Sequence, residues 1–128
     1  MARATFDRLE SVFKCFGENV VYCGDTGIDL EVLNQVIRNS SGNSMTFRAV
    51  VKNAKSGDWT PSFSIGLAYK DMHLALELAD ELGVPLMLSP TVHNLMRMAK
   101  GLGYEHNDAT AILRVYEDTM KMQLKLTD

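Results

Sequence analysis

The chain has 128 residues and a mass of 14.3 kDa, a size that suits a single domain. Hydrophobic residues make up 46% and charged residues 23%, a balance that excludes a disordered tail. The net charge of −3 provides no basic field for a phosphate backbone, so nucleic acid is not expected as a partner.

No apolar run approaches the roughly 18 residues needed to cross a bilayer, so no membrane partner is expected. The first residues pass directly into an amphipathic pattern without a signal peptide, which predicts a cytoplasmic protein. The two cysteines, Cys15 and Cys23, are therefore expected to be reduced thiols.

The N-terminal residues predict one helix and one strand. Apolar residues recur at helical spacing over residues 6–16, and Gly17 stands where a C-terminal helix cap belongs. Residues 19–23 are rich in β-branched and aromatic side chains and are followed by a turn, which predicts a strand. Because no other segment predicts a strand, its backbone must pair outside this chain or fray.

From residue 28 onward the pattern is helical. Asp29 can cap a helix that ends before Asn39, and a weaker helix is predicted over about 45–54. Further helices are predicted over about 66–82, ending at Gly83, and from Ser89 to about residue 102. A last helix, capped by Asp108, is expected to run toward Lys125. The fold class is therefore mostly α, a helical bundle behind a short α-β segment.

A single carboxylate, Asp71, interrupts the apolar face of the longest predicted helix. An ionised carboxylate there must find donors or a cation, or lose its charge. Two interpretations are open. Asp71 either orients a catalytic or ligand-binding group, or it is a structural carboxylate paired with Arg48, Lys52 or Arg97. Taken alone, Lys70 is typical of a solvated helix face.

The remaining chemistry-bearing residues indicate no metal or nucleotide site. His73, His93 and His106 lack metal-ligand spacing and are expected to lie apart. No glycine-rich dinucleotide or phosphate-binding loop motif occurs. Trp59 and Phe63 flank a loop and are expected mainly to anchor it to the core.

Two stretches of the chain resemble a known family. Residues 57–63 are GDWTPSF, and residues 69–76 are YKDMHLAL. They resemble the Pro-x-Phe and Lys-Asp-x-x-Leu-Ala-Leu stretches of the β-hydroxyacid dehydrogenase family, the 3-hydroxyisobutyrate dehydrogenase-like enzymes. The similarity continues through residues 79–86, ADELGVPL, and through Ser40-Ser41-Gly42, so it covers nearly the whole chain.

The resemblance implies a domain organisation and a cofactor. Residues 28–128 would form a helical bundle like the C-terminal domain of 6-phosphogluconate dehydrogenase, and residues 1–27 would be a remnant of the end of a Rossmann domain. The complete family enzyme uses NAD or NADP and oxidises a small 3-hydroxy acid such as 3-hydroxyisobutyrate. A homo-oligomer is also expected.

Three residues match positions of the family's site. Lys70 would reach the cofactor near its nicotinamide end. Asp71 would support the catalytic lysine through hydrogen bonds, and Phe63 would line the substrate side. The resemblance therefore favours a functional role for Asp71 and Lys70 over a structural one.

Two features of the family are missing from this sequence. The glycine-rich dinucleotide fingerprint is absent, and the helix that would carry the catalytic lysine is missing between Gly27 and Ile28, which are adjacent. Hydride transfer needs cofactor, substrate and proton donor in near-contact geometry. We therefore expect the chain to be inactive alone and to bind no cofactor tightly. The alternative is a non-catalytic helical module that dimerises through the faces a missing helix would cover.

Overall fold

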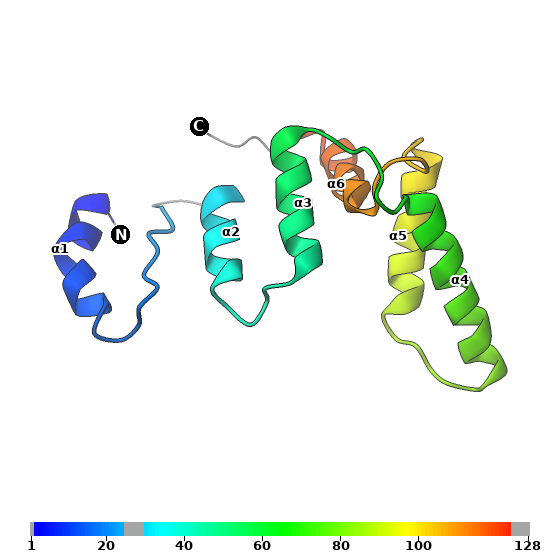
Figure 1. Ribbon diagram of the computed structural model, residues 1–128, viewed down its shortest axis with the longest axis horizontal. Coiled ribbons are helices and arrows are strands. Elements are labelled where there is room, and N and C mark those ends of the chain that lie inside the picture. The colour runs from blue at the N-terminus through cyan, green and yellow to red at the C-terminus, as the bar shows by residue number, and fades with distance from the viewer. Residues whose placement is uncertain (1, 25–29, 124–128) are drawn as a thin grey trace. The chain divides into compact units, whose positions relative to one another are not determined.

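The computed structural model describes residues 2–24 and 30–123, and within them the chain is helical (Figure 1). The elements in order are α1 (Arg3–Phe13), α2 (Leu30–Arg38), α3 (Met45–Ser56), α4 (Ile65–Glu81), α5 (Ser89–Gly101), the 3₁₀ turn η1 (Ala109–Ile112) and α6 (Leu113–Met120). The mostly helical prediction is confirmed. None of the described helices is long and apolar enough to cross a membrane.

The chain divides into two compact units, one ending at residue 55 and the other covering residues 56–123. This division differs from the one expected from the family resemblance. The expected boundary, between residues 27 and 28, lies outside the described residues and stays a prediction.

In the first unit, the strand expected at residues 19–23 does not form, and the segment has no regular secondary structure. A strand is stable only when a neighbour pairs with its backbone, and no sheet exists among the described residues to provide one. The segment instead packs by side chain. The Tyr22 ring lies 5.1 Å from the ring of Phe6, which is buried, and Arg3 lies over Tyr22.

Helices α2 and α3 run antiparallel and are joined by a short loop (Figure 1). Lys55 near the end of α3 forms an ion pair with Glu31 near the start of α2. The Ser44 hydroxyl accepts a hydrogen bond of 3.0 Å from the Phe47 N–H and so satisfies an amide in the first turn of α3. Asp29, the expected cap of α2, lies outside the described residues.

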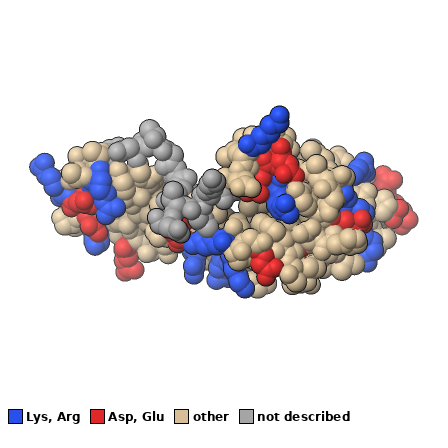
Figure 2. Space-filling model, turned by 90° about the horizontal axis from the view of Figure 1, so that it is seen from above, with Lys and Arg blue, Asp and Glu red and all other residues tan. Residues whose placement is uncertain are grey.

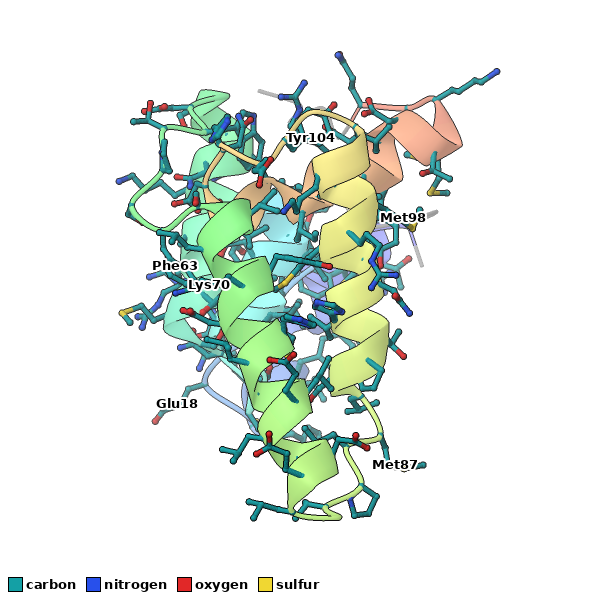
Figure 3. The ribbon with its side chains drawn as sticks, turned by 90° about the vertical axis from the view of Figure 1, so that its right-hand side faces the viewer. Glu18, Phe63, Lys70, Met87, Met98 and Tyr104 are labelled. Atoms are coloured by element: carbon teal, nitrogen blue, oxygen red, sulfur yellow. The ribbon has the colours of Figure 1, made fainter. Side chains whose placement is uncertain are left out.

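In the second unit, α4 and α5 pack along each other (Figures 1 and 3). Helix α4 ends where the sequence predicts, because Gly83 takes the left-handed conformation (φ 65°) that closes a helix. The centre of the unit is formed by four buried residues, with four partly buried neighbours packed against them: Ile65, Ala99, Ala111 and Val115, then Trp59, Leu95, Tyr104 and Ile112. Of the two aromatic residues expected to anchor the loop, Trp59 packs against this core as predicted, whereas Phe63 remains 43% exposed.

The C-terminal helix is shorter than expected. It begins as the 3₁₀ turn η1, continues as α6 and ends at Met120 rather than running toward Lys125. Lys121 has a positive φ of 52°, which ends the helical hydrogen-bond pattern there. The last five residues lie outside the described part of the chain.

Candidate functional site

The residues singled out by the sequence lie on α4 and on the loop before it. The first turn of α4 has its backbone donors satisfied, since Ser64 accepts from the Leu67 N–H at 3.2 Å. The Gly66 N–H donates to the Glu105 carbonyl at 2.9 Å. A Cβ at Gly66 would lie 3.0 Å from the Glu105 side chain and 3.3 Å from its carbonyl, so any larger residue would have to displace Glu105 slightly. The start of α4 is thus fixed against the segment before η1.

Asp108 fixes the loop itself. Its carboxylate, only 5% exposed, accepts hydrogen bonds from the N–H and hydroxyl of Ser62 at 3.0 and 2.9 Å. It also accepts from the N–H and hydroxyl of Thr110 at 3.0 and 2.7 Å. Burial alone would raise the pKa of Asp108, but the bonds from Thr110 and Ser62 outweigh it and hold the pKa far below its usual range. The carboxylate therefore stays ionised and connects the loop at Ser62 to η1 at Thr110.

Phe63 is held by its backbone and not by its ring. Its carbonyl accepts from the Ala109 N–H at 2.8 Å, and its N–H lies 3.5 Å from the Asp108 carboxylate. The residue nevertheless remains 43% exposed. A fixed backbone with a half-exposed ring leaves an aromatic surface that a ligand or partner can cover.

Lys70 and Asp71 form an ion pair on the surface of α4. The Lys70 ammonium lies 3.0 Å from the Asp71 carboxylate, and the side chains are 60% and 54% exposed. Figure 3 shows Phe63 and Lys70 on the same flank of α4. The three residues matched by the family resemblance thus share the N-terminal half of one helix and the loop before it.

Within its own unit, Asp71 does not have the partner that the structural alternative expected. It pairs with its neighbour Lys70 rather than with Arg97, and it is not buried. The physical reason is that the apolar arc around it faces solvent, since Leu74 is 54% exposed. Helical periodicity identifies an apolar face but does not show whether anything covers it. Arg48 and Lys52 belong to the other unit, so pairing with them stays a prediction.

The sequence predicts that the three histidines lie apart, but two of them lie close together. The His93 ring of α5 stacks on the Tyr69 ring of α4 at 4.2 Å between centroids, and the His73 ring lies 5.5 Å from that of His93. The available sequence signal was the spacing of Tyr69 and His73 by four residues, which places two flat rings on one helix face. This ring stack joins α4 to α5.

His93 is buried, and its Nε2 has no hydrogen-bond partner among the described residues. Burial, with Arg97 and His73 nearby, lowers the pKa of His93. On the other side of the stack, the Lys100 ammonium lies 4.5 Å from the Tyr69 ring centroid and pairs with Glu105 at 2.9 Å. Lys100 lowers the pKa of Glu105. The Tyr69 ring thus contacts both the His93 imidazole, whose pKa is lowered, and the Lys100 ammonium.

This arrangement offers groups that can hold a ligand. An exposed ammonium, carboxylate and aromatic ring can bind a polar group and an apolar one on the same flank. No group of three potential metal ligands occurs in residues 2–24 and 30–123. On the face drawn in Figure 2, acidic and basic side chains lie in small groups among uncharged ones.

Comparisons with known proteins place the chain in a family of hydroxyacid dehydrogenases. A solved 3-hydroxyisobutyrate dehydrogenase from Salmonella typhimurium matches it with a TM-score of 0.65 and 25% identity, over 89% of this chain and 51% of that one. The family model described as the NAD-binding domain of NADP-dependent 3-hydroxyisobutyrate dehydrogenase matches residues 11–116. The chain belongs to this family.

Curated relatives point to the same class of oxidoreductase. L-threonate dehydrogenase of Escherichia coli K12 is 30% identical over 99 residues, which cover 77% of this chain and 33% of the relative. 2-(Hydroxymethyl)glutarate dehydrogenase of Eubacterium barkeri is 24% identical over 148 residues, which cover 91% of this chain and 49% of the relative. This chain therefore spans between a third and a half of the length of these relatives.

The second of these alignments contains an internal difference in length. It runs over 148 positions, whereas 91% of the 128 residues of this chain is about 116. The relative therefore has about 30 residues, inside the aligned region, for which this chain has no counterpart.

Proposed function

We propose that this chain forms one wall of the active site of an NAD(P)-dependent dehydrogenase that acts on a small 3-hydroxy acid, such as 3-hydroxyisobutyrate. The observation that carries the proposal is the exposed ion pair of Lys70 with Asp71, in which Lys70 lies on the same flank of α4 as the half-exposed Phe63. Membership of the dehydrogenase family supports the reaction class. The names of the two relatives support a small hydroxy acid as the substrate.

Each residue has a role that fits its surroundings. The exposed ammonium of Lys70 can donate hydrogen bonds to the cofactor near its nicotinamide end. Asp71 can accept a hydrogen bond from a catalytic lysine supplied outside this sequence, and Phe63 can exclude water from the substrate side. NAD(P), when bound, supplies the hydride acceptor. The described residues fit the cofactor as partial contacts.

The proposal includes the domain organisation. Residues 1–27 would be the end of a Rossmann domain, and residues 28–128 the helical domain. A lysine-bearing helix would be missing between Gly27 and Ile28. The Eubacterium barkeri relative has about 30 more residues inside the aligned region, a number that would suffice for a helix of about 45 Å.

The first test is NADPH binding to the purified chain, measured by saturation-transfer NMR because weak binding is expected. Lys70→Ala should weaken it about fivefold, since an exposed charge contact is worth about 1 kcal/mol at most. Lys52→Ala removes an exposed lysine of α3 and serves as the matched control. Equal binding by the Lys70→Ala variant contradicts the role of Lys70. Micromolar affinity of the unaltered chain contradicts the one-wall model.

A second candidate function, dimerisation, is favoured by one observation. Three leucines on one face of α4, and the leucine that directly follows the helix, remain between 49% and 67% exposed: Leu67, Leu74, Leu78 and Leu82. An uncovered leucine row of this kind favours association, and a second copy of this chain offers the same row. Light scattering at increasing protein concentration tests it. A molar mass that stays at 14.3 kDa at all concentrations contradicts this candidate.

A further inference from the structure

A pocket of about 250 Å³ opens in the first unit, between α2 and α3 and beside the loop that joins them. All of its lining residues belong to the first unit, whereas α4 belongs to the other. Charged and amide side chains line it: Glu31, Asn34, Gln35, Arg38, Asn39, Asn43 and Arg48. A lining made entirely of polar residues is unlike the mostly apolar lining of a typical drug-sized ligand site.

The charge of the pocket is positive. Glu31 is neutralised by Lys55, which lowers the pKa of the Glu31 carboxyl, and the amides of Asn34 and Gln35 also donate to it. Arg38 and Arg48 pair with no carboxylate among the described residues. Two guanidinium groups without acidic partners beside one polar pocket are suited to a carboxylate or a phosphate, which accept paired N–H bonds.

The amides add a second kind of contact. Asn39 uses its side-chain N–H to donate to the Gln35 carbonyl at 2.9 Å, which leaves its side-chain oxygen available as an acceptor. The Asn43 side chain has no bond to another side chain or to the backbone among the described residues. Amide groups that both donate and accept are suited to hydroxyl groups.

We propose that this pocket binds a small oxyanion that carries hydroxyl groups, with Arg38 and Arg48 at the anionic group and Asn39 and Asn43 at the hydroxyls. A volume of about 250 Å³ lies just below the roughly 300–1,000 Å³ of typical small-molecule sites. This suits a sugar acid or a sugar phosphate of a few carbons and is too small for a dinucleotide. The shared chemistry is an oxyanion next to hydroxyl groups, and the two sources are separated by the choice of probe.

The experiment is a titration of the ¹⁵N-labelled chain followed by the side-chain signals of arginine Nε–H and asparagine NH₂ groups. The probes are D-gluconate, glycerol 3-phosphate, acetate and glycerol. Gluconate or glycerol 3-phosphate should bind more tightly than acetate, which lacks hydroxyls, and than glycerol, which lacks charge. The tighter of the first two identifies a carboxylate or a phosphate as the preferred anion.

Arg38→Ala and Arg48→Ala should each weaken binding of the better probe at least about tenfold. Arg38→Lys and Arg48→Lys keep the charge but lose the fork of donors, and they should weaken it less. Arg8→Ala removes an exposed arginine of α1 and is the matched control, with affinity unchanged. The proposal is overturned if neither anion binds, if acetate binds as tightly as gluconate and glycerol 3-phosphate, or if the alanine variants, folded by circular dichroism, bind like the control.

Discussion

Asp108 determines the position of Phe63 without contacting its ring. The Asp108 side chain ties Ser62, one residue before Phe63, to the start of η1, so the backbone on both sides of the loop is fixed. The sequence predicts Asp108 as a cap, and its bond to the Thr110 N–H confirms this. Its bonds to Ser62 span 46 residues of sequence, and no local pattern could predict them.

Replacing Asp108 by Asn should destabilise the chain by about 1–3 kcal/mol at pH 7, because a buried acceptor of four hydrogen bonds is partly replaced by a donor. Urea unfolding, followed by the fluorescence of Trp59, measures the change. Trp59 is the single tryptophan, and its carbonyl accepts from the Asp108 N–H at 2.9 Å, so the probe reports on this loop.

The same pair of proteins should differ in acid. The pKa of Asp108 is lower in the folded state than in the unfolded state. Its contribution to the free energy of unfolding is therefore complete above the unfolded pKa of about 3.9 and is lost as the pH falls below that value. The stability gap between wild type and Asp108→Asn should therefore narrow from pH 5 to pH 3. Asp80→Asn, at an exposed position of α4, should change stability by less than about 0.5 kcal/mol. A stability difference between wild type and Asp108→Asn that stays constant with pH contradicts an ionised Asp108 carboxylate in the folded state.

At the scale of elements, hydrophobic periodicity and capping residues predict where helices lie better than what they contact. The helices over 45–54 and 66–82 appear as α3 and α4 within two residues at each end. The strand at residues 19–23 fails because a strand depends on a partner that local sequence does not provide. The stack of Tyr69, His73 and His93 was missed because it depends on how α4 and α5 pack.

His93→Phe tests that packing. A phenyl ring can keep the stack on Tyr69 and remove the buried Nε2 that has no partner, so stability should rise by about 1 kcal/mol at pH 7. Because burial lowers the pKa of His93 in the folded state, protonation of His93 favours the unfolded state. The free energy of unfolding of the wild type should therefore fall as the pH falls below the unfolded pKa of about 6.5.

The gain from His93→Phe should accordingly increase between pH 7 and pH 5, as measured by thermal unfolding. His106→Phe, at an exposed histidine of the same unit, should leave stability within about 0.5 kcal/mol at both pH values. Loss of stability in His93→Phe at pH 5 would show that the imidazole has a polar partner and that the ring stack is not what joins the helices.

At the scale of the whole molecule, the chain has more exposed apolar surface than its composition suggests. The composition is ordinary, with 46% hydrophobic residues, yet α4 carries a row of half-exposed leucines. The relatives are two to three times as long, and one has about 30 residues inside the aligned region that are missing here. The family was predictable from the residues around Lys70 and Asp71, whereas the uncovered state of α4 required the structure.

If the leucine row of α4 mediates self-association, a charge at its centre should abolish it. Leu74→Lys introduces an ammonium that would lose water at a dimer interface, at a cost of several kcal/mol, so light scattering should show the 14.3 kDa monomer at concentrations where wild type associates. Leu102→Lys alters a leucine of similar exposure, at the end of α5 and outside the row, and should associate like wild type. Equal loss in both variants would mean that added charge, rather than this face, controls association. Unchanged association of Leu74→Lys would show that the second copy docks elsewhere and that the leucine row does not mediate self-association.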